Sequence, residues 1–196
     1  MQSSPTQLAA HLQRGLKALY TVHGDEALLV QEAADAIRAA ARAQGFAERS
    51  VCTVSGAHFD WSAVLAAGRS QSLFAERQLL ELRIPSGKPG KEGAAVLQQL
   101  AAAAPHHPDL LTLVLLPRLD ATTLKSPWFA ALEQHGLTLR IDAVERAQLP
   151  AWIAQRLRLQ GQHVPSGEAG QLCLGFLADR VEGNLLAAHQ ELQKLA

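Results

Sequence analysis

The sequence predicts an α/β protein with a parallel sheet flanked by helices, followed by a small helical unit. Short apolar runs alternate with segments of helical periodicity as far as about residue 143, and strand-like runs stop beyond that point. Strands that alternate with helices favour a parallel sheet with right-handed crossovers. Several of the apolar runs are continuous, which is typical of strands that are covered on both faces.

Five apolar runs are predicted as strands, at residues 19–22, 51–54, 78–84, 110–116 and 138–141. After the first of them, Gly24 indicates a turn, and Asp25 is a candidate N-cap for the helix that follows. That helix carries one apolar face and one charged face. The apolar positions that define this helix and the next three are Leu29, Ala33, Ile37 and Ala40; Trp61, Leu65 and Ala66; Ala94, Leu97, Leu100 and Ala101; and Trp128, Phe129 and Leu132.

We therefore expect an α/β domain over residues 1–143 and a small helical domain over residues 144–196. Two helices of the second domain are indicated by Leu149, Ile153 and Leu157, and by Leu172, Phe176 and Leu177. A third begins after Gly183-Asn184 and runs to the last residue with neither Gly nor Pro to end it. This pattern favours a chain cut from a longer one, and a natural end that frays is the alternative.

The composition argues against a strongly basic nucleic-acid module. Lys and Arg total 18, as do Asp and Glu, and basic residues never occur three in a row, whereas phosphate neutralisation needs clustered cations. Cys52 and Cys173 each lie in an apolar stretch, which favours buried free thiols in a reducing compartment over a disulfide. Since neither a signal peptide nor a membrane-spanning run is visible, we expect a cytoplasmic chain without membrane contact.

The turn after the first strand does not match a phosphate-binding loop. Such a loop needs glycines, a Lys and a Ser or Thr hydroxyl, but residues 22–26 contain no Lys. Asp25 and Glu26 would repel phosphates there, and they suit the positive end of the following helix instead. The glycine-rich stretch 86–92 has the wrong spacing for such a loop and is predicted to be a mobile surface loop.

The sequence shows no catalytic constellation. Its eight His residues form no metal-binding pattern, and the side chains of the adjacent His106 and His107 diverge. Asp120 stands alone after the fourth strand, where a helix cap or turn residue is the expected role. We therefore predict no catalytic residue, no metal ion and no cofactor.

Leu73 and Phe74 form an apolar pair inside a polar stretch between a helix and a strand. Adjacent residues on a helix point about 100° apart, so that one narrow buried stripe does not easily hold both. The pair could anchor in a pocket of another protein. Residue physics alone favours the alternative, in which both side chains fold back over the edge of the sheet.

The chain resembles a known family, the delta subunits of the bacterial DNA polymerase III clamp-loader complex. The resemblance covers the whole chain, and the order and spacing of several stretches carry it. These stretches are LYTVHGDE at residues 19–26, SLFAERQLLEL at 72–82, LKSPWF at 124–129, RAQLPAWI at 146–153 and RVEGNLLAA at 180–188.

The resemblance implies an AAA+-like α/β domain without a working ATP site, followed by a lid-like helical domain. It also implies a non-catalytic subunit of the DNA-directed DNA polymerase III holoenzyme that binds the sliding clamp, its beta subunit, and helps to open it. The clamp contact would fall on Ser72, Leu73 and Phe74, which reverses the preference for a buried pair. The family's third domain, a collar that joins the ATPase subunits and delta-prime, is expected to be absent from this chain.

Two other functions remain open at this level. One is a nucleotide-binding α/β ATPase, which the architecture alone suggests. The other is a scaffold subunit of a replication complex that makes no clamp contact. Contact with DNA is expected to be indirect or weak, because the loop residues that could meet phosphate are more simply explained as solvated surface charge. These residues are Arg83, Lys88, Lys91, Arg118 and Lys125.

Overall fold

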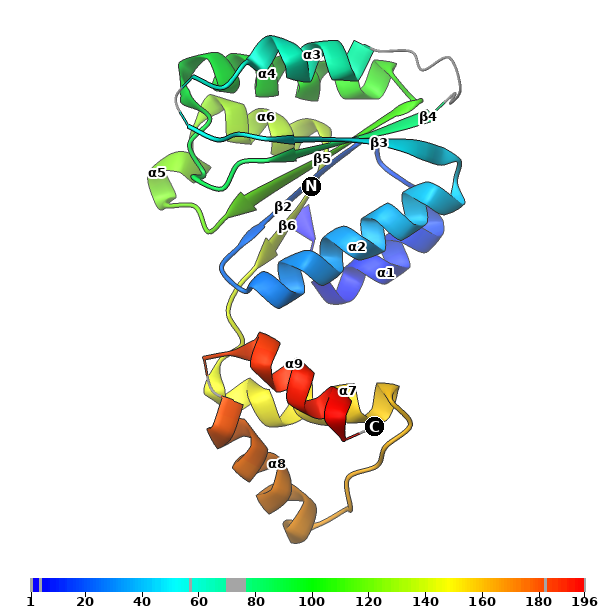
Figure 1. Cartoon of the computed structure of the whole chain (residues 1–196), viewed down its shortest axis with the longest axis vertical. Helices are drawn as coiled ribbons and strands as arrows, with labels where there is room; N and C mark the ends of the chain where they lie inside the picture. Colours follow the sequence, from blue (N-terminus) through cyan, green and yellow to red (C-terminus); the bar gives the residue numbers. More distant parts are fainter. Residues whose placement is uncertain (1, 4, 57, 70–76, 182, 196) are drawn as a thin grey trace. The chain divides into compact units, whose positions relative to one another are not determined.

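The computed structural model describes residues 2–3, 5–56, 58–69, 77–181 and 183–195. The chain divides into two compact units, one made of Met1–Asp25 with Leu29–Ile141, the other of Glu26–Leu28 with Asp142–Ala196. The first unit combines a sheet with helices, and the second consists of helices in its described part (Figure 1).

A parallel sheet forms the centre of the α/β unit. Its strands lie in the order β1-β6-β2-β5-β4-β3, and every neighbouring pair is parallel. All five strands expected from the sequence are present, and a two-residue strand at the N-terminus adds a sixth. The bounds are β1 (Gln2–Ser3), β2 (Leu19–Gly24), β3 (Phe46–Thr53), β4 (Arg77–Arg83), β5 (Leu110–Pro117) and β6 (Leu137–Ile141).

Helices cover both faces of this sheet (Figure 1). On one face lie α1 (Pro5–Arg14) and α2 (Ala27–Ala43), whose buried residues pack with Tyr20, Val22 and other strand residues. On the other face lie α3 (Trp61–Arg69), α4 (Gly90–Ala103) and α6 (Pro127–His135), which pack with Leu80, Leu82 and Val114. The short helices of this unit are η1 (Ala104–His106) and α5 (Ala121–Leu124). The sheet and both layers together match the predicted fold class.

Two elements near the start of the chain differ from the sequence-based expectation. The helix α1 and strand β1 were not predicted, because the buried Leu8 and the half-buried Leu12 give only a weak helical pattern.

Strand β3 begins at Phe46, five residues before its predicted start, and its exposure alternates along the strand. This alternation reflects its place at the end of the sheet order, where the polar residues Glu48 and Ser50 are half-buried.

The helical unit contains η2 (Arg146–Gln148), α7 (Leu149–Leu159), α8 (Glu168–Val181) and α9 (Leu185–Lys194). The face predicted for α7 is confirmed, since Leu149, Ile153 and Leu157 are all buried. The face predicted for α8 is wrong: Leu172 is 67% exposed and Phe176 is 58% exposed. The helix packs through its smaller residues Gly170 and Ala178, because these allow close approach of the neighbouring backbone.

The cysteines are also less buried than the sequence suggested. Both are free, but Cys52 is only half-buried on the edge strand β3, and Cys173 is exposed on α8. No helix in the described part of the chain is long and apolar enough to cross a membrane.

Candidate functional site

The carboxyl ends of β2 and β5 mark the point of the sheet where α/β proteins most often bind ligands. These two strands are neighbours, and the chain leaves them toward opposite faces, to α2 after β2 and to α6 after β5 (Figure 1). In open α/β sheets such a reversal opens a crevice, and ligands bind there.

In this chain an ion pair joins the ends of these two strands. Arg118, which directly follows β5, donates from Nη1 to Oδ2 of Asp25 at 2.9 Å, and Asp25 directly follows β2. Only Asp25 and Glu26 separate the last residue of β2 from Ala27, the first residue of α2. A turn of two residues is too short to wrap a phosphate group with backbone N–H groups.

Gly24, at the end of β2, serves the packing of the sheet rather than a phosphate. A Cβ atom at this position would lie 1.9 Å from the carbonyl oxygen of Ile141 on the neighbouring strand β6. The close approach that glycine permits is therefore already taken by protein backbone. This geometry supports the sequence-based interpretation of the turn as a structural one.

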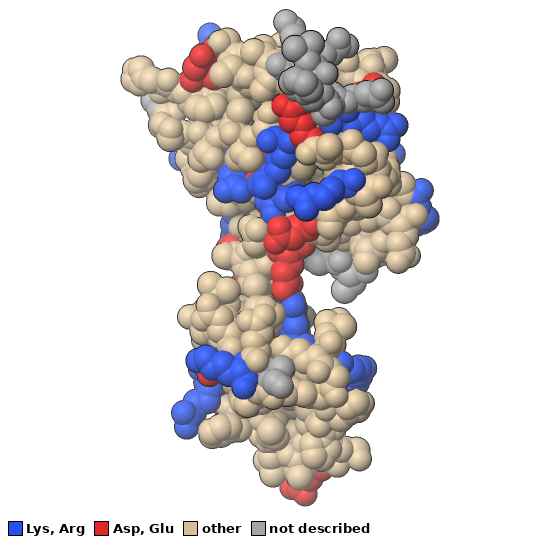
Figure 2. All heavy atoms as spheres, turned by 45° about the vertical axis from the view of Figure 1, so that its right-hand side comes forward, with Lys and Arg blue, Asp and Glu red and all other residues tan. Residues whose placement is uncertain are grey.

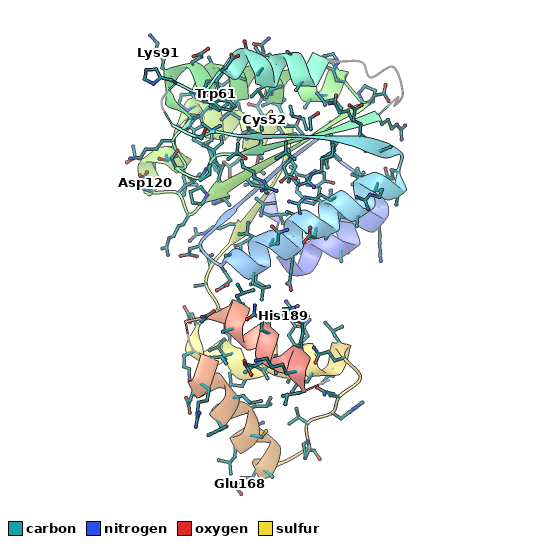
Figure 3. All side chains as sticks on the ribbon, in the orientation of Figure 1. Cys52, Trp61, Lys91, Asp120, Glu168 and His189 are labelled. Atoms are coloured by element: carbon teal, nitrogen blue, oxygen red, sulfur yellow. The ribbon has the colours of Figure 1, made fainter. Side chains whose placement is uncertain are left out.

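The other residues singled out at this edge have structural roles. Asp120 is the N-cap of α5 and accepts a hydrogen bond from the backbone N–H of Thr123 at 2.7 Å, which lowers the pKa of its carboxyl group. The predicted capping role of Asp120 is thus confirmed, and Figure 3 shows it beyond the end of β5. In the stretch 86–92, Gly87 and Gly90 adopt positive φ angles, and α4 begins at Gly90.

Two histidines of the α/β unit have roles in packing and hydrogen bonding. The ring of His23 packs edge-on against Phe129, with centroids 5.3 Å apart. His11 Nε2 lies 3.1 Å from the hydroxyl of the buried Tyr20. Among the residues that the structure describes, no three His, Cys, Asp or Glu side chains are grouped to hold a metal ion.

Sequence reasoning missed the strongest electrostatic feature of the α/β unit, which we call the Glu81 cluster: Glu81, Arg38, Arg49 and Arg83. Glu81 on β4 is completely buried. The Nε atoms of Arg38 and Arg49 lie 2.9 and 3.0 Å from its Oε2, and Nε of Arg83 lies 2.7 Å from Oε1. Asp35 accepts a further hydrogen bond from Arg38.

The cluster keeps Glu81 ionised in spite of its burial. Burial alone would raise the pKa of Glu81, but the hydrogen bonds from Arg38 and Arg83 and the charges of Arg38 and Arg49 lower it overall. The signal in the sequence was an acidic residue in the middle of an otherwise apolar strand, since a buried charge requires partners. The identity of those partners depends on α2 and β3, and local sequence does not reveal it.

The three residues predicted to contact a clamp, Ser72, Leu73 and Phe74, lie outside the described residues. The described chain ends before them with Arg69, the last residue of α3, and continues after them with Arg77, the first residue of β4.

The parallel sheet with helices on both faces is AAA+-like in fold, and the two-residue turn between β2 and α2 has no room for a phosphate-binding loop. A profile of the family described as "DNA polymerase III, delta subunit" matches residues 20–142. The chain belongs to this family.

Two relatives with that name extend the likeness beyond the matched segment. DNA polymerase III subunit delta of Escherichia coli (strain K12) is 36% identical over 193 residues, which cover 98% of this chain and 54% of the relative. The subunit of the same name from Haemophilus influenzae is 30% identical over 194 residues, or 97% of this chain and 54% of the relative. The chain spans about half the length of the curated relatives it matches.

A solved structure agrees on the fold. The DNA clamp loader delta protein of Bacillus subtilis superimposes with a TM-score of 0.69 and 18% sequence identity, over 97% of this chain and 56% of that one. At this level of identity the superposition supports the architecture and carries no information on individual residues.

Proposed function

We propose that this chain binds the ring-shaped sliding clamp, the beta subunit of the replication machinery, and helps to open it for loading onto DNA. The observation that carries the proposal is the 36% identity to a DNA polymerase III delta subunit across 193 residues. The ion pair at the carboxyl ends of β2 and β5 supports a role without catalysis, because it occupies the place where an ATPase of this fold would hold nucleotide.

The proposed contact consists of Ser72, Leu73 and Phe74, with the two apolar side chains entering a pocket on the clamp. The motivation is the resemblance of this stretch to the family's clamp-contacting motif, together with the position of two large apolar residues inside a polar segment. A pocket that buries two such side chains gains about 1.5–3 kcal/mol from each.

The test is the affinity of the full chain for purified clamp, measured by surface plasmon resonance. The double substitution Leu73→Ala with Phe74→Ala should weaken binding by about 100-fold or more. The double substitution Leu172→Ala with Phe176→Ala is a matched control, since it removes an exposed apolar pair from α8 in the helical unit. Unchanged affinity in the Leu73 and Phe74 variant would overturn the proposed contact.

The opening of the clamp is tested separately from its binding to this chain. Clamp loaded on circular DNA should be released when this chain is added, and the Leu73 and Phe74 variant should release it more slowly. Clamp that is bound but never released would restrict the function to binding.

The partners proposed for proteins of this family at their full length are the clamp-loader ATPase subunits and delta-prime, within a cytoplasmic polymerase III assembly. We assign the AAA+-like role to residues 1–143 and a lid-like role to residues 144–196, with the collar domain in the part of the family's sequence that this chain does not match. Contact with DNA is proposed to be indirect or weak.

Two alternatives are distinguished by direct measurements. A nucleotide-binding ATPase would bind ATP with magnesium at micromolar concentrations in calorimetry, and we expect no such heat because Asp25 and Glu26 occupy the turn. A scaffold subunit would fail to retain clamp in a pull-down with purified proteins. Clamp retention without ATP binding is the combination that the proposed function requires.

A further inference from the structure

The edge strand β3 has an open surface next to the Glu81 cluster, formed by Arg49, Val51, Thr53 and Arg83, which we call the β3 surface. Val51 lies opposite Glu81 in the register of β3 and β4, and Thr53 lies opposite Arg83. Residues in register on neighbouring strands, and residues two apart on one strand, share a face of the sheet. All four side chains therefore lie on the face that carries α2, whose Arg38 reaches Glu81.

This surface is accessible in spite of the helix. Val51 is 46% exposed, and the side chains of Arg49 and Arg83 are 40% and 42% exposed. Figure 2 shows Lys and Arg side chains gathered across the middle of the α/β unit. Beyond β3 the sheet has no further strand among the described residues, so the outer edge of its backbone is available for pairing.

The two exposed arginines are held in place while part of each remains available. Arg49 and Arg83 each direct Nε and Nη2 at a single oxygen of Glu81, at distances between 2.7 and 3.0 Å. In the described part of the chain, the hydrogen bonds and ion pairs of these two side chains are made by Nε and Nη2 and not by Nη1. A guanidinium fixed in this way can receive a carboxylate with little further loss of side-chain entropy.

The β3 surface carries a local excess of positive charge. Three guanidinium groups surround the single carboxylate of Glu81, and Asp35 forms an ion pair with Arg38. The excess is local, since the whole chain has equal numbers of acidic and basic residues. A short acidic ligand therefore fits better than a long polyanion, whose binding depends on many phosphate contacts.

We propose that the β3 surface binds an extended acidic segment of a partner protein, which adds a strand alongside β3. The spacing of β3 sets the pattern of that segment: an acidic residue beside Arg49, an apolar residue beside Val51, and a second acidic residue beside Thr53 and Arg83. Strand addition supplies backbone hydrogen bonds, and alternate side chains supply specificity. A peptide rather than a nucleic acid is favoured because only a peptide backbone pairs with a strand edge.

The test uses two fluorescent peptides and the full chain. One probe contains Glu-Thr-Val-Thr-Glu between Ser residues, and the reference replaces both Glu residues by Gln. We expect the Glu probe to bind in fluorescence anisotropy, with affinity falling at high salt, and the reference to bind about tenfold more weakly or worse. Hydrogen exchange of the complex should show added protection of the β3 amides.

The decisive variant is Val51→Glu, which places a carboxylate between Arg49 and Arg83 and leaves every residue of the Glu81 cluster unchanged. It should weaken binding of the Glu probe by about tenfold or more, whereas the control Val51→Thr should retain it. Absent binding of the Glu probe, equal binding of the Gln reference, or full binding by Val51→Glu would each overturn the proposal.

Two other occupants give distinct results. Tighter binding of an oligothymidylate than of the Glu probe, lost in Val51→Glu, would assign the surface to nucleic acid and overturn a protein partner. Self-association of the wild-type chain in sedimentation, abolished by Val51→Glu, would assign the surface to a second copy. The contact is independent of Leu73 and Phe74, so their replacement should leave probe binding unchanged.

Discussion

At the scale of single residues, Glu81 has the largest consequence for stability in the α/β unit. Its carboxylate is completely buried and neutralised by three guanidinium groups. Removal of one partner from a buried ion pair leaves an uncompensated charge in the protein interior. The stability lost in this way is larger than the net contribution of the intact pair.

Glu81→Gln should therefore lower the free energy of unfolding by about 3 kcal/mol. The control Glu191→Gln removes a carboxylate that is paired with Lys194 on an exposed helix face, and it should change stability by less than about 0.5 kcal/mol. Urea denaturation of both variants, followed by circular dichroism, provides the comparison. Equal changes in the free energy of unfolding would show that the burial of Glu81 does not increase the cost of its replacement.

The same residue predicts a pH dependence. Because the pKa of Glu81 is lowered in the folded chain, its stabilising effect is fully present above the unfolded-state pKa of about 4.3 and is lost as the pH falls through the lower folded-state value. The difference in unfolding free energy between wild type and Glu81→Gln should shrink as the pH is reduced from about 7 to 3. A constant difference over this range would contradict the charge-based explanation.

At the scale of helices, replacement of two helical glycines by alanine is expected to change the stability in opposite directions. A Cβ atom at Gly93 on α4 would lie 2.2 Å from Cζ2 of the buried Trp61 on α3, whereas a Cβ atom at Gly175 on α8 would meet no atom within 4 Å. The first glycine lets two helices approach closely, and the second only weakens its helix.

We expect Gly93→Ala to destabilise the chain by about 1–3 kcal/mol through overpacking. Gly175→Ala should stabilise α8 by up to about 1 kcal/mol, because alanine loses less backbone entropy in a helix. Thermal denaturation of the two variants beside wild type measures both signs. A stabilising Gly93→Ala would show that the indole of Trp61 moves aside without cost.

The elements that sequence patterns predicted well are those buried on both sides. Strands β2, β4 and β5 are rich in apolar residues and almost entirely buried, so that their positions could be predicted from the local sequence. The first half of β3 was missed because an edge strand carries polar residues on both faces. For α8, the periodic residues Leu172 and Phe176 suggested a buried face, but periodicity does not say whether a partner covers it.

The candidate sites also differ in whether local sequence is enough to predict them. The turn at Gly24, Asp25 and Glu26 could be interpreted from local residues because a phosphate-binding loop is itself a local motif, but the ion pair of Asp25 with Arg118 could not. The Glu81 cluster joins α2, β3 and β4, and its hydrogen-bonded members Arg38 and Glu81 are 43 residues apart in sequence. Only the fold brings them together. Leu73 and Phe74 remain a prediction from sequence and resemblance.

At the scale of the whole chain, local stability should be uneven. Strand β2 pairs with β5 on one side and β6 on the other, and its side chains from Leu19 to His23 are all buried. Helix α8, by contrast, buries only Gly170 and Ala178. Segments with few buried apolar contacts open at lower free energy than the core of a sheet.

Hydrogen exchange followed by mass spectrometry should therefore show the slowest amides in β2 and β5, and the fastest helical amides of the second unit in α8. The buried positions of α7 and α9 serve as an internal reference, since Ile153 and Leu192 are both buried. Exchange in α8 as slow as in β2 would mean that its exposed apolar residues are covered in solution.

The close contact between Gly24 and Ile141 also bears on how the turn after β2 could be redesigned. A phosphate-binding turn could not be introduced here by exchanging one residue for another, since a phosphate-binding motif spans about eight positions and only two residues separate β2 from α2. Its introduction would require an insertion, and a side chain at position 24 would displace the end of β6. Under the proposed function, any dependence on ATP would therefore enter through partner proteins.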